Sequence, residues 1–472
     1  EEWDKYKGYC LNDVELTYNV AAKLMPMIPQ REFKVMDSTL NWYVDPKLRL
    51  DMTMLGDQVT NEKAYMQTHL KSSGLDQKTL ASQPKFKEWL EAQGIECPMK
   101  PSPSNAEKMI PALAKSDKAF MALTEHPNPT IAVACQARVA AKSRIKETRM
   151  ERFVGIGQRN GGKLPVPLLC YGAQTQRYAG DEAINMQNLP VVIRAGITAP
   201  PGYKIMSADQ GQIEARIKAG LAYAMASILS GHDDLIEGFR NGEDVYSDMA
   251  TSIYGIPITE DTHPGERKVG KAIVLGAGYG MGGERCYDFL TGQWGIKGIS
   301  AEFAMTCVNT YRTRMHYIVS NWKTVNALLA TLVYGGEAEY GPVIFRHEEV
   351  ELPSGMKLYY PDITHDGKNY QYRRYDRKTR KWNWVKIYGA MMVENICQAL
   401  ARELLTEQML LLEKKWDSVH QIHDEGWFLV PEDEEEVACK VAQKIMTIPP
   451  SWMPNLPLKV EPTTAYRASD LK

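Results

Sequence analysis

The sequence predicts an α+β fold in which long helices and antiparallel strands occupy different parts of the chain. Residues from about 30 to 165 read as mostly helical, with breaks at glycine and proline clusters. Strand-like segments follow, and one of them, Val419 to Val430, has the pattern of a hairpin with His423 and Asp424 at its tip. Two short acidic segments about two hundred residues apart, at Asp209 and Asp424, favour a fold that brings strand ends together.

The remaining elements are expected in the following order along the chain. A helix carrying Tyr9 and Asp13 opens the sequence, and the apolar segment Lys204 to Ala208 forms a strand that ends at Asp209. The later elements are a helix from Gln212 to about Gly231, two helical runs over 300–334, strands over 348–361 and 370–388 with a turn at Asp366-Gly367, and a helix over Asn395 to Lys415.

Composition bounds the class of protein. The chain has 472 residues, enough for two to four compact units, and a formal net charge of −2, which argues neither for nor against nucleic acid. No apolar run is long enough to span a membrane and no signal-peptide pattern opens the chain, so we expect a soluble, cytoplasmic protein with no membrane partner. The 8 cysteines lack zinc-site spacing, which predicts reduced, structural thiols.

Two stretches are strongly basic. Residues 138–163 and 366–386 each carry eight lysines and arginines against two acids. The second stretch also interleaves Tyr370, Trp382 and Trp384 with its cations. A solvated surface is the ordinary interpretation of such a stretch, and phosphate contact is the alternative. We expect Lys142 and Arg144 to contact phosphates.

Asp209 and Asp424 are the candidates for binding divalent cations, because hard cations need anionic oxygens on rigid strand ends. A pair of Mg²⁺ ions about 4 Å apart, or Mn²⁺ in their place, suits in-line phosphoryl transfer. Between the two acids, Pro264 predicts a helix start, and Arg267, Lys271 and Leu275 then fall on one helix face. Two cations and an apolar residue on one face suit a nucleoside triphosphate.

Three segments resemble motifs A, B and C of the DNA polymerase I family (family A), in residues, order and spacing. They are Asp209 to Arg216, Arg267-x3-Lys271-x7-Tyr279-Gly280, and Gln421 to Glu425. Thr175-Gln176-Arg177 and Asn185 to Pro190 resemble two further elements of that family. The match covers roughly residues 30–470 and is most similar to bacteriophage members.

The resemblance implies a right-hand fold: an antiparallel palm, helical fingers and a helical thumb. The domains expected from it are the C-terminal remnant of a 3′–5′ exonuclease domain over 1–28, the thumb and its connection over 29–165, palm over 166–215, fingers with a β insertion over 216–390, and palm over 391–472. The first two exonuclease motifs are absent, so this chain is not expected to proofread.

The implied function is template-directed DNA synthesis from deoxynucleoside triphosphates on primer-template DNA. Catalysis is assigned to Asp209, Asp424 and Lys271, and metal binding to Asp209, Gln210, Asp424 and Glu425. Substrate contacts are assigned to Arg267, Lys271, Leu275, Tyr279, Glu214, Tyr246 and Gln212. DNA contacts are assigned to Arg177, Gln187, Asn188, Lys142, Arg144, Gln398 and His423.

Glu214 occupies the position at which the family excludes ribonucleotides, where it is held by the motif B tyrosine, here Tyr279. Three residues depart from the family pattern: Gln176 stands in place of glycine, Leu275 in place of an aromatic ring, and Tyr246 in place of a phosphate-binding histidine. An RNA polymerase of the same architecture is the first alternative, disfavoured by Glu214 and Glu425. A catalytically silent DNA-binding subunit is the second, and no processivity factor can be named from the sequence.

Overall fold

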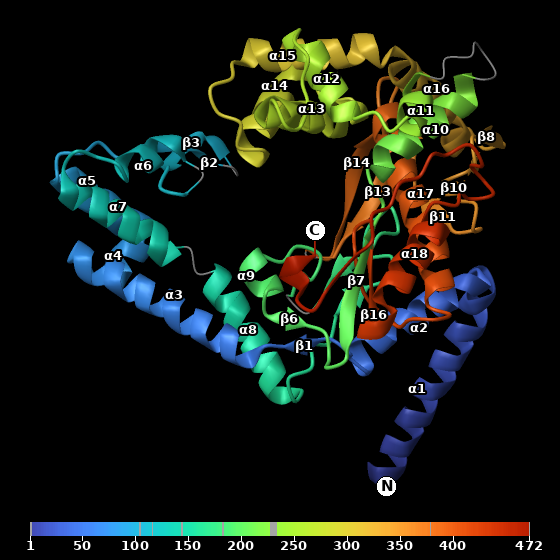
Figure 1. Ribbon diagram of the computed structural model, residues 1–472, viewed down its shortest axis with the longest axis horizontal. Helices are drawn as coiled ribbons and strands as arrows, with labels where there is room; N and C mark the ends of the chain where they lie inside the picture. Colours follow the sequence, from blue (N-terminus) through green and yellow to red (C-terminus); the bar gives the residue numbers. More distant parts are fainter. Residues whose placement is uncertain are drawn as a thin grey trace. The chain divides into compact units, whose positions relative to one another are not determined.

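The computed structural model describes residues 2–102, 105–115, 117–142, 145–181, 184–226, 234–377 and 379–471. These form two compact units. Unit 1 comprises Glu1–Pro46, Val166–Asn188 and Gly202–Ala465, and unit 2 comprises Lys47–Pro165, Leu189–Pro201 and Tyr466–Lys472. Mixed helices and strands confirm the α+β class (Figure 1).

Unit 1 is built around a four-stranded antiparallel sheet with the order β15–β16–β7–β17. The strands are β7 (Tyr203–Asp209), β15 (Ser418–Ile422), β16 (Glu425–Pro431) and β17 (Thr463–Ala465). The register places Glu425 opposite Asp209 and Pro431 opposite Tyr203. β7 and β16 therefore lie side by side although the sequence separates them widely (Figure 1). The predicted strand and the predicted hairpin are both confirmed.

Five helices of unit 1 pack against this sheet or against one another. The helices are α2 (Gln30–Val44), α10 (Ile213–Ala226), α16 (His316–Tyr334), α17 (Gly389–Leu412) and α18 (Glu435–Met446). α17 begins earlier than the predicted Asn395, because the Gly389 backbone N–H donates to Asn326 Oδ1 at 3.0 Å. A Cβ at Gly389 would lie 1.9 Å from the Trp322 carbonyl oxygen, so only glycine permits this crossing of α16 and α17.

Buried ion pairs hold α2 to α17. Arg402 donates to Glu32 at 2.6 Å, Tyr171 donates to the same carboxylate at 2.7 Å, and Arg31 pairs with Glu403. Glu32, Arg402 and Glu403 are all buried, and removing one partner of such a network leaves an uncompensated charge. α2 is therefore part of unit 1 and not of the helical segment that follows it in sequence.

A second group of helices in unit 1 packs around its own apolar cluster, which includes Val269, Ile273 and Cys307. It contains α11 (Asp234–Arg240), α12 (Val245–Tyr254), α13 (Pro264–Gly276), η2 (Ala277–Tyr279), α14 (Gly283–Asp288), η3 (Phe289–Gln293) and α15 (Ala301–Arg314). α13 begins at Pro264, as predicted. The helix from Gln212 is confirmed to Ala226, and its predicted end near Gly231 lies outside the described residues.

Two small antiparallel sheets complete unit 1. One contains β8 (Ala338–Tyr340), β9 (Val343–Arg346), β10 (Glu349–Glu351) and β11 (Lys357–Tyr359), and the other β12 (Thr364–His365), β13 (Tyr370–Asp376) and β14 (Lys381–Ile387). The predicted strand over 370–388 is a hairpin, and the predicted turn at Asp366 is confirmed by its N–H, which donates to the Asn369 carbonyl at 3.1 Å. A short pair of strands, β4 (Leu168–Leu169) and β5 (Ala179–Gly180), also belongs to unit 1.

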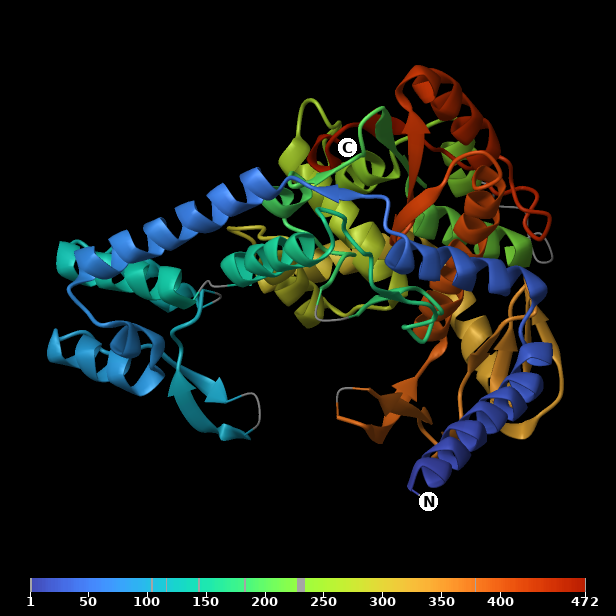
Figure 2. The ribbon, with the colours of Figure 1, turned by 90° about the horizontal axis from the view of Figure 1, so that it is seen from below.

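Unit 2 is mainly helical. Its elements are β1 (Arg49–Leu50), α3 (Met52–Ser73), α4 (Gln77–Ala81), α5 (Gln83–Ala92), β2 (Met99–Ser102), β3 (Asn105–Pro111), α6 (Lys118–Leu123), α7 (Pro129–Lys142), α8 (Ile145–Arg159), α9 (Val191–Arg194), β6 (Ile197–Thr198) and η5 (Ala468–Asp470). α3 lies along α7 and α8 (Figures 1 and 2). The predicted break near Pro98 is the start of the β2–β3 hairpin, because prolines favour extended backbone there.

The first basic stretch, residues 138–163, exposes fewer cations to a ligand than its composition suggests. Arg138 is buried among the apolar residues of α7, and its guanidinium donates to the Leu80 carbonyl at 2.6 Å. Lys142 is exposed in the last turn of α7, whereas Arg144 lies outside the described residues. Arg138 therefore cannot contribute to a phosphate-binding surface, although it counts among the cations of this stretch.

The N-terminal helix α1 (Glu2–Leu24) contains no buried residue. All 8 cysteines are free thiols, as predicted. Among the described helices, none has both the length and the apolar composition needed to cross a membrane.

Candidate active site

Three carboxylates meet at one end of the central sheet, and we call Asp209, Asp424 and Glu425 the acidic edge. Asp209 ends β7 directly opposite Glu425 at the start of β16, and Asp424 lies in the tight turn before it. The Gln210 backbone N–H donates to the Asp424 carbonyl at 3.2 Å, which ties the end of β7 to that turn. The strand register thus brings the two predicted metal-binding acids together.

The turn that carries Asp424 is held by Gln187. His423 adopts a left-handed conformation with a φ of 52°, which is uncommon for a residue with a side chain. Gln187 Oε1 accepts from the His423 N–H at 3.2 Å, and its Nε2 donates to the Gln421 carbonyl at 3.0 Å. Gln187 is buried, so its amide supports the turn and is not available for the DNA contact predicted for it. The His423 side chain is exposed.

Burial and the proximity of the acids raise the pKa values of Asp209 and Asp424. Partial desolvation, followed by repulsion from Asp424 and then Glu425, raises the pKa of Asp209 to about 7, while the Lys271 ammonium opposes the shift. Desolvation also raises the pKa of Asp424, and the Arg177 guanidinium opposes that rise. A site that disfavours its own negative charge gains most from a bound cation.

Two other predicted metal ligands are engaged elsewhere. Glu425 Oε1 accepts from Trp427 Nε1 at 2.6 Å and also from Ser207, so this carboxylate is anchored to the face of the sheet. The Gln210 side chain is buried and donates to Gln408 Oε1 at 2.6 Å. The Gln210 side chain is therefore engaged by Gln408, and the prediction that Gln210 binds a metal stays a prediction for the residue's other atoms.

The carboxylates of Asp209 and Asp424 suit a hard divalent cation that also binds ligands from outside the protein. Within the described ranges, no three or more His, Cys, Asp or Glu side chains are arranged to hold a metal by themselves. Mg²⁺ usually binds through one or two carboxylates together with substrate phosphates, and Asp209 and Asp424 supply such a pair.

The cations of α13 lie beside Tyr246 of α12. The Arg267 guanidinium and the Lys271 ammonium lie 5.7 and 5.6 Å from the centroid of its ring. Tyr246 is buried, so its ring packs beneath the cations, whereas the family pattern predicts a phosphate contact at this position. Arg267 also forms an ion pair with Asp244 at 2.5 Å. A Cβ at Gly270 would lie 2.2 Å from the Tyr246 carbonyl oxygen, so glycine is required where α12 and α13 meet.

A second constellation, which we call the Glu214 cluster, comprises Glu214, Arg177, Tyr279 and Lys218. Tyr279 donates its hydroxyl hydrogen to Glu214 Oε2 at 2.7 Å, and Arg177 pairs with Glu214 Oε1 at 2.8 Å. Burial raises the pKa of the Glu214 carboxyl, but Arg177, the Tyr279 hydroxyl and Lys218 together outweigh it and lower the pKa. Glu214 is therefore an anion held at both oxygens, and Arg177 is committed to it.

Lys218 was not singled out from the sequence. It is buried in α10, donates to the Val274 carbonyl at 3.1 Å and lies 4.1 Å from the centroid of the Tyr279 ring. Desolvation lowers its pKa. Val274 is in the last turn of α13, where a cation complements the helix dipole. A lone lysine among the apolar residues of α10 was the available signal.

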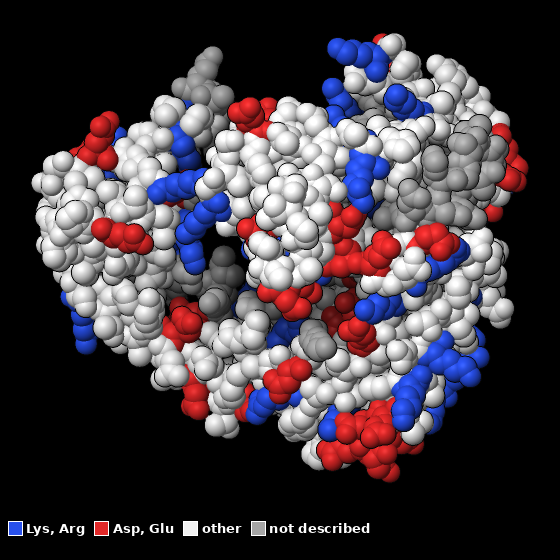
Figure 3. Space-filling model, turned by 45° about the horizontal axis from the view of Figure 1, so that its top comes forward, with Lys and Arg blue, Asp and Glu red and all other residues white. Residues whose placement is uncertain are grey.

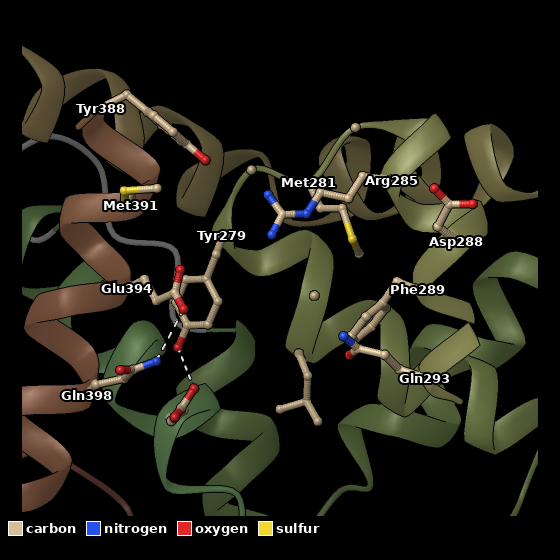
Figure 4. Close-up of a pocket in the computed structure, with 15 residues that line it drawn as sticks. Tyr279, Met281, Arg285, Asp288, Phe289, Gln293, Tyr388, Met391, Glu394 and Gln398 are labelled. Atoms are coloured by element: carbon tan, nitrogen blue, oxygen red, sulfur yellow. Dashed lines mark hydrogen bonds between the residues drawn. The ribbon is translucent and has the colours of Figure 1, made fainter. Parts of the chain in front are cut away.

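A cavity of about 630 Å³ opens above the Glu214 cluster (Figure 4). Figure 4 shows Tyr279 beside Glu394 and Gln398 of α17, with Phe289 and Gln293 across from them, and Leu275 also lines the cavity. Gln398 donates to Glu394 Oε1 at 3.2 Å, and Arg285 reaches into the cavity from α14. Sequence reasoning missed Glu394 and Arg285, although Glu394 lies one helical turn before Gln398 on the same helix face.

The remaining predicted residues lie near these groups. Gln212 has a φ of 59° at the start of α10. Gln176 has a φ of 63°, which accounts for glycine at this position in the family pattern, and its amide compensates by donating to the Lys357 carbonyl at 2.9 Å. Asn188 is exposed. On the face shown in Figure 3, basic and acidic side chains are interspersed.

Comparisons with known proteins agree with this geometry. Residues 54–469 match the model of a family described as DNA polymerase family A. A DNA polymerase of Bacillus phage SP02 is 25% identical over 98% of this chain and 74% of its own length. DNA polymerase I of Pseudomonas aeruginosa is 26% identical over 73% of this chain and 33% of its own length. The thermostable DNA polymerase I of Thermus aquaticus is 23% identical over 71% of this chain and 37% of its own length.

A solved structure shows the same fold. The POL domain of Pol1 from M. smegmatis, in complex with DNA primer-template and dNTP, superposes with a TM-score of 0.68 at 18% sequence identity. The match covers 97% of this chain and 74% of that one. The chain thus spans most of the phage relative and of this domain, but only about a third of the two bacterial polymerases, with 33% and 37% covered.

Proposed function

We propose a reaction for this chain from the premise that it belongs to DNA polymerase family A, a family of DNA-directed DNA polymerases. The resemblance of its three motifs to that family is thereby confirmed. Our proposal is that the chain adds deoxynucleotides to the 3′ end of a primer by phosphoryl transfer, on a template that selects each base. The observation that carries it is the strand register that brings Asp209 and Asp424 to one edge of the sheet, beside Lys271.

In this proposal Asp209 and Asp424 hold two Mg²⁺ ions, with Glu425 in an outer position because Trp427 and Ser207 already engage it. Such ions, when bound, lower the pKa of the primer's terminal hydroxyl and compensate charge on the phosphates. Main-chain pairing of β7 with β16 places the residues that carry both carboxylates at one edge of the sheet. No side chain has to act as a nucleophile.

Lys271 and Arg267 are proposed to bind the β- and γ-phosphates of the incoming nucleotide. Both project from one face of α13, over the buried ring of Tyr246. Arg267 is paired with Asp244, so a phosphate must compete with that carboxylate or bind the guanidinium nitrogens that remain. Lys271 is then the better donor of a proton to the leaving pyrophosphate.

The Glu214 cluster is proposed to select deoxyribose. Glu214 lines the cavity, and its two oxygens are held by Tyr279 and Arg177, so the carboxylate cannot swing away from a 2′-hydroxyl. Leu275 lines the same cavity and would pack against the sugar. This favours a DNA polymerase over an RNA polymerase of the same architecture.

The DNA partner is proposed to be primer-template duplex, the kind of DNA bound by the POL domain of Pol1 in its solved complex. Gln398, Asn188 and His423 are accessible in or near the site and remain candidates for DNA contact, and Lys142 is a candidate in unit 2. Arg177 is paired with Glu214, so a DNA contact would have to share its guanidinium with that carboxylate or replace the pair. Gln187 is not among these candidates, because its amide holds the His423 turn.

The right-hand division also remains a proposal. The central sheet corresponds to the palm, the helices α11 to α16 with the two small sheets to the fingers, and the helices of unit 2 to the thumb. Helix α1 is proposed to be the end of an exonuclease domain, which accords with exposed apolar side chains such as Trp3 and Leu11. Deleting α1 should then leave primer extension within about twofold of the intact chain, since none of its residues is buried.

Primer extension tests the function directly. The intact chain is mixed with a primer-template and either deoxynucleotides or ribonucleotides, with Mg²⁺ or Mn²⁺ or with a chelator. We expect extension that depends on the divalent cation and strongly prefers deoxynucleotides. Equal use of ribonucleotides would favour the RNA polymerase alternative, and binding without extension under every condition would favour the silent DNA-binding subunit.

A further inference from the structure

The β13–β14 hairpin presents two chemically different faces. On one face the cross-strand pairs Tyr370 with Ile387 and Tyr372 with Val385 pack against the main core of unit 1. Strand alternation places the neighbouring residues on the opposite face. That face carries the pairs Tyr375 with Trp382, Arg373 with Trp384, and Gln371 with Lys386. We call this second set the aromatic face.

Large aromatic rings on the aromatic face are unusually accessible. Trp382, Trp384 and Tyr375 are 51%, 54% and 45% exposed. Tyr375 and Trp382 have ring centroids 5.6 Å apart, and the Arg373 guanidinium lies 5.6 Å from the centroid of the Trp382 ring. Exposure of two tryptophans on one strand is not explained by folding, because burying them would be favourable.

Exposed rings interleaved with cations on a sheet are the chemistry that binds single-stranded nucleic acid. Unpaired bases stack on the rings in a sequence-tolerant way, and cations follow the phosphates. The aromatic face itself carries two cations, Arg373 and Lys386, and no acid, so its charge is complementary to a phosphate backbone. Trp, Tyr and Arg are also common at protein–protein interfaces, so binding of a protein by this face is the alternative outcome of the test.

The aromatic face is continuous with the candidate active site. β14 ends at Ile387, and the next residue, Tyr388, lines the large cavity. A second cavity of about 470 Å³ shares Gly280 and Tyr388 with the first and is lined by Arg312 and Lys323. The seven residues from Trp382 to Tyr388 extend about 20 Å at the rise of a strand. Figure 2 shows the orange hairpin projecting from the body of unit 1.

We propose that the aromatic face binds the unpaired template strand next to the active site, by stacking bases on Trp382 and Trp384 and contacting phosphates through Arg373 and Lys386. This inference rests on the proposed polymerase function for the identity of the strand. The length of the face suits about four nucleotides, the lower end of known sites for single strands.

The test measures binding of the intact chain to primer-templates that share one duplex and differ in the template 5′ overhang, either one nucleotide or about eight. We expect the long overhang to bind about tenfold more tightly. Trp382→Leu with Trp384→Leu should remove this preference and leave single-nucleotide addition on the short overhang unchanged. Arg373→Ala with Lys386→Ala should flatten the salt dependence of long-overhang binding by about one unit.

Tyr334→Leu is the matched control, because Tyr334 is a 75% exposed ring at the end of α16, outside the aromatic face. It should leave the overhang preference intact. An intact chain without overhang preference, or a double tryptophan variant that keeps it, would overturn the proposal, including the case in which the face binds a protein. Binding is measured without nucleotide, so absence of primer extension would refute the proposed function and still leave this result interpretable.

Discussion

The acidic edge and the Glu214 cluster lie in the same unit but are held in place by different forces. Asp209 and Asp424 are positioned by backbone pairing, through the β7–β16 register and the N–H of Gln210. Glu214 is positioned by side chains alone, through Tyr279 and Arg177. Apart from the Gln187 amide that holds the His423 turn, the first arrangement depends on the main chain, whereas the second depends on every side-chain partner.

This difference has energetic consequences. At the acidic edge, desolvation and then repulsion between the carboxylates raise the pKa of Asp209 to about 7. The ionised carboxylates are therefore unfavourable without a cation. In the Glu214 cluster the opposite charges satisfy one another, which lowers the pKa of Glu214. We therefore expect all-or-none effects on chemistry at the acidic edge and graded effects on selectivity in the cluster.

The largest effect is expected at the acidic edge. Asp209→Asn or Asp424→Asn should reduce primer extension by at least about a thousandfold, because several kcal/mol of charge stabilisation are lost. Primer-template binding should stay within a few-fold, since the backbone register is unaffected. Single-turnover extension and equilibrium binding measure the two quantities.

Glu425→Gln is the control for this prediction. Its carboxylate is anchored by Trp427 and Ser207, so the variant should lose at most about tenfold in extension rate. A loss as large as that of the aspartate variants would place Glu425 among the direct metal ligands. Ordinary extension by either aspartate variant would refute the metal assignment.

The next largest effect concerns the sugar. Glu214→Ala opens the space beside Tyr279, and discrimination against ribonucleotides should fall by about a hundredfold, mainly through better ribonucleotide use. Glu214→Gln keeps the volume and an acceptor for Tyr279, so it should retain most of the discrimination. Competition between paired deoxy- and ribonucleotides gives the ratio. If both variants behave like the parent, another residue excludes the 2′-hydroxyl.

Lys218→Met tests whether a buried charge supports the cluster. Without its cation the Tyr279 ring is held less firmly, and discrimination should fall by about fivefold. Stability should rise by about 1 kcal/mol at neutral pH, because burying the charge is costly.

The pH dependence of that gain has a defined sign. The folded-state pKa of Lys218 is lowered from 10.5, so the unfolded chain binds more protons and wild-type stability rises with pH over this range. The advantage of Lys218→Met should therefore shrink as the pH approaches 10.5. Urea unfolding from neutral to alkaline pH measures it, and a constant difference would mean that folding does not lower the pKa of Lys218.

The smallest effect is expected at Leu275. Leu275→Phe should fold normally, speed single-nucleotide incorporation by about twofold through contact with the sugar, and change the discrimination against dideoxynucleotides. Ribose exclusion should be unaffected, because Glu214 and Tyr279 are unchanged. Pre-steady-state incorporation with each sugar distinguishes these effects. A loss of ribose exclusion would show that Leu275 belongs to the same selective unit.

Sequence patterns predicted the acidic edge better than its surroundings. A strand ending in Asp209 and a hairpin with Asp424 at its tip are local features, visible as apolar runs followed by acids. The partners of the Glu214 cluster come from α10, η2 and a loop, so only resemblance to a family could connect them. Lys218 could not be predicted as buried, because lysine is rarely buried without a carboxylate.

Charge counting failed for a related reason. The stretches 138–163 and 366–386 each have eight cations and two acids, yet Arg138 is buried against the Leu80 carbonyl while Trp382 and Trp384 are exposed. A count of charges does not show which face of a helix or strand each one occupies. In residues 366–386, the alternation of aromatic and charged residues along each strand indicates which residues share a face.

The register between β7 and β16 also determines which genetic changes the catalytic centre can tolerate. Most apolar residues of β16 can be replaced by another apolar residue without displacing Asp424, because the position of β16 is set by main-chain pairing with β7. Loss of a single codon within that strand, however, shifts the register by one residue on one side of the deletion. It either turns the following side chains to the opposite face or moves Glu425 and Asp424 out of register with Asp209. In-frame deletions across residues 425–431 should therefore be depleted from the viable variants of this gene far more strongly than substitutions at the same positions.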